Sequence, residues 1–133
     1  MITFVDTNVL LDVFLPDPTH GDRSAEALER AFSEGSLVIN GLVYAELSPQ
    51  FGSRKRLDGV LDQLGLRILE IEREVAFDAG KAWKAYRKSG GKRDRILADF
   101  LIGAHAAKRA DRLLTRDRGF YKRYFKSIAI LKP

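Results

Sequence analysis

Short apolar runs alternate with longer segments of helical periodicity along the whole chain. The apolar runs occupy residues 2–5, 37–39, 67–69, 112–114 and 128–130. The segments between them carry apolar residues three and four positions apart, over residues 8–14, 24–34, 41–47, 54–64, 75–86, 96–107 and 119–124. Strands that alternate with helices build a parallel sheet covered on both faces. We therefore predict a three-layer α/β/α fold with a central parallel sheet, forming a single domain over residues 1–133.

The composition excludes several classes of site. The chain has no cysteine, so it holds no disulfide, no thiolate nucleophile and no zinc-thiolate centre. Its only histidines are His20 and His105, which argues against a histidine-rich metal site. No apolar run approaches the roughly 20 residues that a membrane-spanning helix needs, and no basic segment followed by a long apolar stretch opens the chain. We expect a soluble cytoplasmic protein without a membrane partner.

Charge is distributed unevenly along the chain. Residues 1–83 carry eight Lys and Arg against fourteen Asp and Glu, whereas residues 84–133 carry fifteen against four. The two parts therefore have net charges of −6 and +11. The cations gather in two groups, around Gly90-Gly91 and over residues 116–126. Such density attracts a polyanion such as RNA, and it equally suits an acidic protein partner.

Four acidic residues stand out from this background. Asp6 and Asp117 lie just beyond predicted strands, and Glu46 and Asp99 lie on predicted helices. Asp99 is followed by apolar or small residues at positions +3, +4 and +7, so it lies on the helix face that points away from solvent. A carboxylate on such a face needs a partner. Ligand sites in parallel sheets form outside the carboxyl ends of the strands. His105 lies about 240° around the helix from Asp99, and we interpret it as a packing or surface residue.

Clustered carboxylates without cysteine or histidine favour a hard divalent cation. Oxygen-only ligands suit magnesium or manganese better than zinc. Such an ion polarises a phosphate and helps to form hydroxide from bound water, and a second ion would stabilise the leaving oxygen. The residues alone leave the number of ions open. They also leave open a plainer interpretation, in which Glu46 is a solvent-facing acid and Asp117 a helix N-cap.

The acidic residues lie in segments that resemble the PIN-domain ribonucleases. Phe4-Val5-Asp6-Thr7-Asn8-Val9-Leu10 is similar to the opening of that family, and Val43-Tyr44-Ala45-Glu46-Leu47 carries its second acid. Asp99 with the following Ile102-Gly103-Ala104-His105-Ala106 matches the third, and residues 113–120 resemble the closing segment. Among PIN domains, a chain of this size is most similar to the VapC-like toxins. The resemblance implies a Mg²⁺-dependent endoribonuclease (with Mn²⁺ as a substitute), an RNA substrate, a VapB-like antitoxin and a homodimer.

The resemblance also implies roles for individual residues. We expect Asp6 and Asp99 to be the central metal ligands. Asp117 would complete the ligand set or act through water, and Glu46 would orient or deprotonate the attacking water. The expected hydrogen-bond donors to these carboxylates are Thr7, Asn8 and Thr115. The expected contacts to RNA phosphates are Arg116, Arg93 and Arg95.

Other interpretations compete with a toxin. An RNA-maturation nuclease would have the same site, and a non-catalytic RNA- or partner-binding module would have the same fold. A phosphatase of the haloacid-dehalogenase type is unlike this chain, since its second aspartate would fall at Asn8. Among the aromatic residues, we predict that Phe77 and Trp83 belong to the core. Tyr121 and Tyr124 are interpreted as partly buried helix residues rather than platforms for RNA bases.

Overall fold

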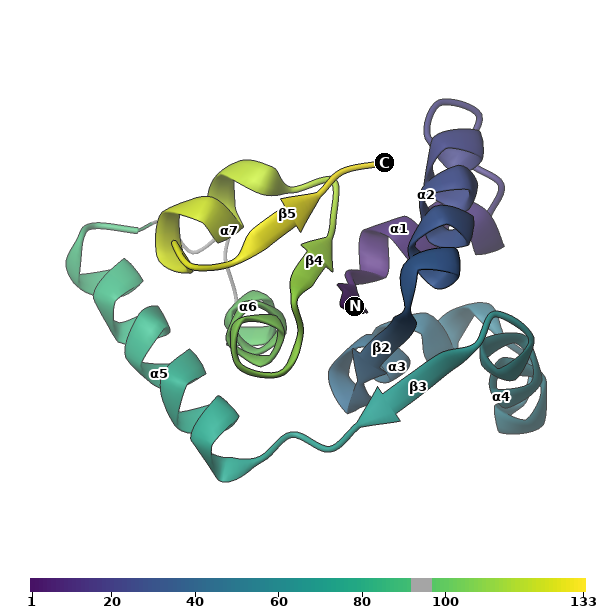
Figure 1. Ribbon diagram of the computed structural model, residues 1–133. Helices are drawn as coiled ribbons and strands as arrows, with labels where there is room; N and C mark the ends of the chain where they lie inside the picture. Colours follow the sequence, from purple (N-terminus) through teal and green to yellow (C-terminus); the bar gives the residue numbers. More distant parts are fainter. Residues whose placement is uncertain (92–96) are drawn as a thin grey trace.

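Five parallel strands form the central sheet of the computed structural model, which describes residues 1–91 and 97–133 (Figure 1). The strands are β1 (Ile2–Val5), β2 (Ser36–Asn40), β3 (Leu66–Leu69), β4 (Arg112–Leu114) and β5 (Ala129–Leu131). Their order in the sheet is β3-β2-β1-β4-β5. The chain therefore reverses its direction of travel across the sheet next to β1, between β1 and β4. Such a switch point is where open α/β sheets bind ligands.

Helices cover both faces of the sheet. The helical elements between β1 and β3 in the chain are α1 (Thr7–Phe14), α2 (Gly21–Glu34), α3 (Gly41–Leu47), the short 3₁₀ turn η1 (Ser48–Gln50) and α4 (Arg54–Gln63). The helices that follow β3 in the chain are α5 (Arg73–Lys88), α6 (Leu97–Arg109) and α7 (Arg118–Tyr124). In Figure 1, α1 and α2 lie on one side of the sheet and α5 and α6 on the other. The predicted three-layer parallel fold is confirmed, and no predicted helix or strand boundary differs from the observed one by more than three residues.

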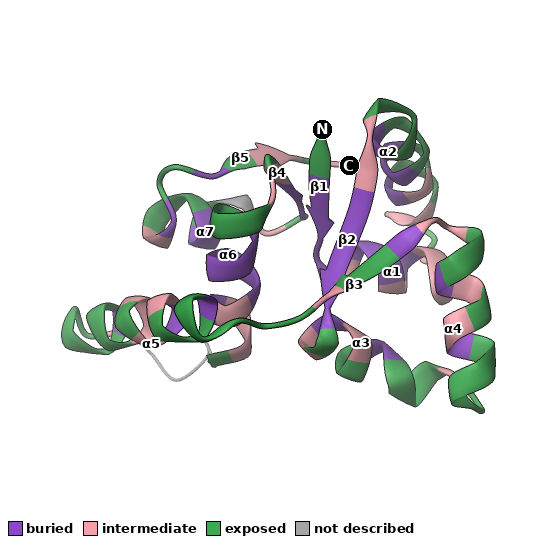
Figure 2. Cartoon of the chain, turned by 60° about the horizontal axis from the view of Figure 1, so that its bottom comes forward, coloured by how far each residue is buried: buried purple, intermediate pink, exposed green. Residues whose placement is uncertain are grey.

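The core lies where the central strands meet α6. Phe4 and Val5 of β1, Ile39 of β2 and Leu113 of β4 are fully buried. Helix α6 is buried through its middle, and α5 packs against it (Figure 2). Gly103 lets Phe125, at the end of α7, approach α6, since a side-chain carbon at Gly103 would lie 2.3 Å from the Phe125 ring. The three central strands β1, β2 and β4 are buried over most of their length, which explains why they read as apolar runs rather than as alternating patterns.

Helix α5 ends in a glycine motif. Gly90 adopts a φ of 80°, a left-handed conformation that favours glycine. The backbone N–H of Gly90 donates to the carbonyl of Arg87 at 3.2 Å, and the N–H of Gly91 donates to Tyr86 at 2.9 Å. These two bonds form a Schellman motif, which satisfies the last carbonyls of the helix.

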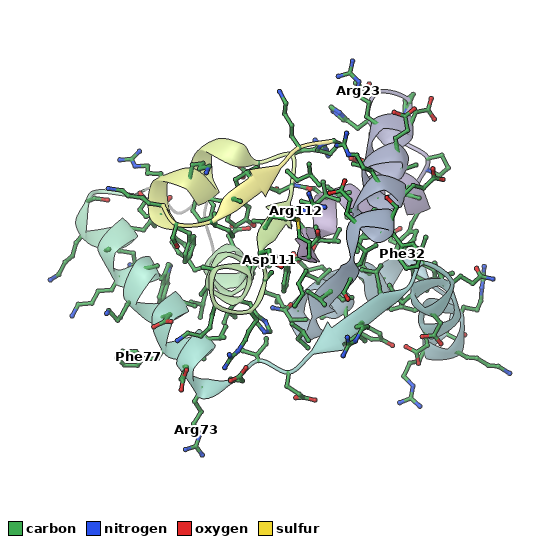
Figure 3. All side chains as sticks on the ribbon, in the orientation of Figure 1. Arg23, Phe32, Arg73, Phe77, Asp111 and Arg112 are labelled. Atoms are coloured by element: carbon green, nitrogen blue, oxygen red, sulfur yellow. The ribbon has the colours of Figure 1, made fainter. Side chains whose placement is uncertain are left out.

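The prediction that Phe77 belongs to the core is wrong. Its side chain is 70% exposed and projects from α5 into solvent (Figure 3). The buried residues of α5 are Val75, Ala79 and Tyr86, and Phe77 lies two positions after Val75, which places it on the opposite side of the helix. Trp83 is half-buried against the core rather than enclosed by it.

The amino ends of the strands are held by polar contacts that face away from the candidate site. The Asp111 carboxylate accepts a hydrogen bond from the backbone N–H of Ile2 at 2.6 Å. Arg112 donates to Thr3 at 2.8 Å and pairs with Glu34 at 3.1 Å, and both Asp111 and Arg112 are labelled in Figure 3. Within the part of the chain that the structure describes, no helix is long and apolar enough to cross a membrane.

Candidate active site

Asp6 occupies the switch point of the sheet. It follows β1 directly, is 6% exposed, and its backbone N–H donates to the carbonyl of Leu114 in β4 at 2.9 Å. Its carboxylate oxygen Oδ2 accepts a hydrogen bond from Oγ1 of Thr115 at 2.7 Å and one from Nδ2 of Asn8 at 3.3 Å. Adjacent parallel strands thus bring together residues that are 109 positions apart in the sequence.

Burial raises the pKa of the Asp6 carboxyl from 3.8 to about 6. The negative charge of Asp99 adds to this rise. Hydrogen bonds from Thr115, from the hydroxyl of Tyr121 and from the backbone of Thr7 act in the opposite direction, because they favour the ionised form. A cation bound beside this buried carboxylate and the second negative charge would stabilise the ionised form of Asp6.

Tyr121 is a member of the site that sequence analysis did not assign to it. The side chain is 1% exposed, and its hydroxyl is hydrogen-bonded to Asp6. Burial raises the pKa of this phenol, and the charges of Asp6, Asp99 and Asp117 raise it further. Three of the four predicted acids therefore act on one hydroxyl group. The signal was a tyrosine on the apolar side of a short helix, because a buried tyrosine needs a hydrogen-bond partner for its hydroxyl.

The other predicted acids lie around Asp6 on different elements. Asp99 is half-buried in the first turn of α6. Asp117 occupies the N-cap position of α7, where its side chain makes no capping hydrogen bond, and its backbone N–H donates to Oγ1 of Thr115 at 3.0 Å. Glu46 is exposed on α3 and accepts a hydrogen bond from Oγ1 of Thr7 at 2.7 Å. Thr7 thus links Glu46 to the residue next to Asp6.

Arg116 is engaged by a buried acid. Its Nε and Nη2 atoms donate to the two carboxylate oxygens of Asp12 at 2.8 and 3.1 Å, and Asp12 is 4% exposed. The hydroxyl of Ser24 donates to the same carboxylate at 2.7 Å. This pairing ties the loop that carries Asp117 to α1 and α2, so the geometry supports an anchoring role for Arg116. The predicted contact of Arg116 with RNA stays a prediction, and Arg93 and Arg95 lie outside the described residues.

His105 is buried on α6, as a packing residue should be. The side-chain nitrogen of Asn40 lies 3.1 Å from Nδ1 of His105, and the same Asn40 caps α3 by accepting hydrogen bonds from Leu42 and Val43. Burial lowers the pKa of His105, which favours the neutral ring. The predicted packing role of His105 is confirmed.

The carboxylates suit a hard divalent cation by their chemistry, but in the described part of the chain their side chains do not form a ready-made metal site. Within residues 1–91 and 97–133, no three His, Asp or Glu side chains lie close enough together to form a ready-made metal site. The donors are nevertheless oxygen atoms, and the pKa of Asp6 is raised by causes that a bound cation would offset.

The comparison with protein families decides the classification. The family model of the PIN domain matches residues 3–126. The chain belongs to the PIN-domain family. The match spans the strands β1, β2, β3 and β4 and all four acidic positions, so the resemblance found in the sequence is confirmed.

Several solved structures share this fold. VapBC2 from Rickettsia felis, solved with a DNA fragment from its promoter, is similar with a TM-score of 0.74 and 22% identity over 100% of this chain and 99% of that chain. FitAcB from Neisseria gonorrhoeae has a TM-score of 0.70 and 24% identity over 98% and 96%. VapC20 from Mycobacterium tuberculosis, described as a toxin that cleaves the sarcin–ricin loop, has a TM-score of 0.64 and 15% identity over 96% and 98%. At these identities the likeness concerns the fold of the PIN domain.

A curated protein matches only a short part of the chain. Tar DNA-binding protein homolog 1 from Caenorhabditis elegans is 47% identical over 45 residues, which cover 30% of this chain and 11% of that protein. A match of this extent carries no argument about the activity of the PIN domain.

Proposed function

We propose that this PIN domain is a metal-dependent endoribonuclease that acts as the toxin of a VapBC-type pair. The observation that carries the proposal is the pair of Asp6, buried with a raised pKa, and Asp99, whose charge acts on it at the switch point of the sheet. A nuclease acting in RNA maturation would use the same residues, and a non-catalytic binding module would not need an acid held at this energetic cost.

Asp6, Asp99 and Asp117 would hold Mg²⁺, for which Mn²⁺ is the natural substitute. Such an ion polarises the scissile phosphate and lowers the pKa of bound water. Thr115 and Asn8 fix the orientation of the Asp6 carboxylate by donating to Oδ2. The hydroxyl of Thr7 donates to Glu46, and this contact supports the proposed role of Glu46 in orienting or deprotonating a water molecule.

The reaction itself is tested with end-labelled transfer and ribosomal RNA. We expect the purified protein to cut a small number of sites in the presence of Mg²⁺ or Mn²⁺, and to cut none in EDTA. Binding of RNA without any cleavage in either metal would favour the non-catalytic module instead. The positions of the cuts would also begin to identify the RNA substrate.

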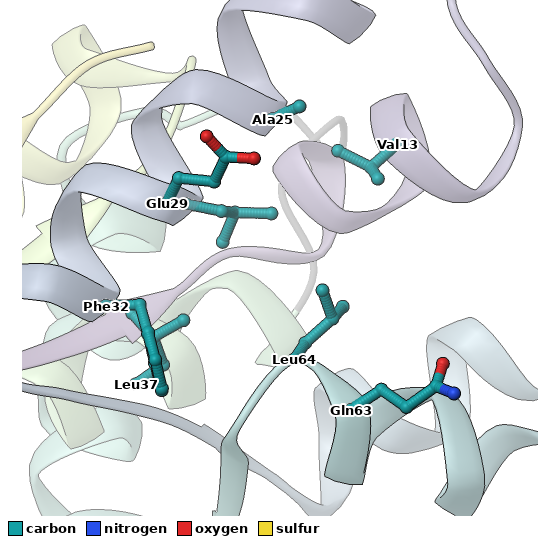
Figure 4. Close-up of a pocket in the computed structure, with 8 residues that line it drawn as sticks. Val13, Ala25, Glu29, Phe32, Leu37, Gln63 and Leu64 are labelled. Atoms are coloured by element: carbon teal, nitrogen blue, oxygen red, sulfur yellow. The ribbon is translucent and has the colours of Figure 1, made fainter.

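An apolar cavity marks the surface proposed for the antitoxin. It has a volume of about 290 Å³ and lies between α1, α2 and the end of α4 (Figure 4). Its lining is mostly aliphatic or aromatic, with Val13, Ala25, Leu28, Phe32, Leu37 and Leu64 beside Glu29 and Gln63. The solved structures with this fold include VapBC and FitAcB complexes, which supports an antitoxin segment with apolar side chains as the occupant of this surface.

Substitution of Phe32, which lines this apolar cavity, tests the proposed antitoxin surface. Its ring is 55% exposed and covers Gly65, whose φ of 70° favours glycine. We expect Phe32→Glu to abolish co-purification with a co-expressed antitoxin while RNA cleavage stays within about twofold of wild type. Retention of the complex would show that the antitoxin binds elsewhere. Sedimentation of the free protein would test the homodimer, which stays a prediction.

A further inference from the structure

Acidic residues at the N-cap and in the first half of helix α5 are paired with α6. Nε of Arg109 donates to Glu72 at 2.7 Å. Nζ of Lys108 lies 3.3 Å from Glu74 and 3.4 Å from Asp78. The last turn of α6 therefore neutralises this half of α5.

The second half of α5 is basic and has no such partners. Lys81, Lys84, Arg87 and Lys88 are exposed, and none of them forms an ion pair with any residue that the structure describes. The guanidinium of Arg87 lies 5.1 Å from the ring centre of the half-buried Trp83. Trp83, Lys84, Arg87 and Lys88 line a shallow hollow of about 430 Å³. We call these four residues the α5 basic surface.

Tyr86 joins the helix of the α5 basic surface to the elements of the candidate active site. The ring of Tyr86 packs 5.5 Å from that of Phe100, the residue after Asp99, and 5.5 Å from that of Tyr124 on α7. Tyr86 thus rests on the two helices that carry Asp99 and Tyr121. In Figure 1 this end of α5 lies near α7, whereas α4 lies at the far end of the molecule.

We propose that the α5 basic surface binds single-stranded RNA beside the scissile phosphate. Cations without acidic partners can meet backbone phosphates, and a tryptophan next to them offers a face on which a base can stack. Arg87 and Lys88 also complement the dipole at the end of α5, but Trp83 and Lys84 lie a turn earlier and gain little from that effect. The proposal rests on the proposed ribonuclease function, since it assigns this surface to the substrate of the same site.

The test compares two triple variants that remove the same charge. Lys84→Ala/Arg87→Ala/Lys88→Ala removes three cations from α5, and Arg54→Ala/Lys55→Ala/Arg56→Ala removes three exposed cations from α4. The probe is a fluorescein-labelled single-stranded RNA whose binding is followed by anisotropy in EDTA at several salt concentrations. We expect the α5 triple variant to bind at least about tenfold more weakly, with a salt slope reduced by about 2 for three lost phosphate contacts. The α4 triple variant should bind like wild type.

Trp83→Phe and Trp83→Ala test the stacking contact. We expect Trp83→Ala to weaken RNA binding by about tenfold and Trp83→Phe to retain most of the affinity. In the cleavage assay, the α5 triple variant should raise KM while kcat stays close to wild type, because the surface does not touch the reacting atoms.

Several outcomes would overturn the proposal. Equal losses in both triple variants would show an unspecific charge effect, and unchanged RNA affinity in the α5 variant would remove the surface from RNA recognition. Loss of antitoxin binding with RNA affinity unchanged would assign it to a protein partner. If no RNA is cleaved but binding still depends on the α5 basic surface, the ribonuclease function fails while RNA binding by this surface stands.

Discussion

Asp6→Asn should make the metal-free protein more stable at pH 7.5, by about 1 to 3 kcal/mol. The pKa of Asp6 is raised to about 6 in the folded protein, mainly by burial, whereas the unfolded chain has an ordinary aspartate. The folded state therefore binds the proton more tightly, and stability is lost as the pH rises from about 4 through about 6. Two pKa units correspond to roughly 3 kcal/mol, which sets the upper limit of the effect.

The measurement is urea unfolding in EDTA at pH 7.5 and at pH 4. The gain in unfolding free energy should disappear at pH 4, where Asp6 is protonated in the folded wild type. Asp62→Asn makes the same chemical change at an exposed position of α4 and should alter stability by less than about 0.5 kcal/mol. If Asp6→Asn destabilises the protein at both pH values, then Asp6 is a structural acid, and the cost assigned to its ionisation is wrong.

Arg116→Ala should destabilise the protein, by about 1 to 3 kcal/mol. The substitution leaves the Asp12 carboxylate, which is 4% exposed, with Ser24 as its remaining side-chain donor. A buried charge without its partner is costly, and the 35% exposure of the Arg116 side chain moderates the loss. The loop that holds Thr115 and Asp117 should loosen at the same time.

A double-mutant cycle separates anchoring from substrate binding. Asp12→Asn removes the buried charge and keeps an acceptor for Ser24. The free energy of unfolding of Asp12→Asn/Arg116→Ala should therefore be at least about 1 kcal/mol higher than the sum of the two single-variant losses predicts. If Arg116→Ala instead keeps full stability and raises KM for RNA, the guanidinium serves the substrate, as the sequence suggested.

Asp6, Asp99 and Asp117 could be singled out from patterns that are local in the sequence, whereas Glu46 was singled out by the family resemblance. Asp6 and Asp117 come after apolar runs, and the carboxyl ends of parallel strands meet at one edge of a sheet. The helix that carries Asp99 was recognisable from its period. The pairing of Asp6 with Thr115 then follows from the register of β1 and β4, which the sequence does not specify.

The remaining features depend on contacts across the fold. Asp12 lies inside an apolar helix, which signals a need for a partner, but that partner is 104 positions away. Phe77 was predicted in the core because its side chain is apolar. Its position in the helical period nevertheless points this side chain outward. Trp83 was assigned to the core for the same reason, although the basic residues around it in the sequence indicate a surface.

The most direct test of the metal-dependent acidic site is the initial rate of cleavage of one end-labelled RNA across a range of Mn²⁺ concentrations. Wild type, Asp99→Asn and Asp62→Asn are compared in preparations of equal purity. We expect the rate of wild type and of Asp62→Asn to rise together and saturate, and Asp99→Asn to be slower by about 100-fold or more at every concentration. Equal rates for Asp99→Asn and wild type would contradict the account, because the carboxylate facing Asp6 would then have no part in the reaction.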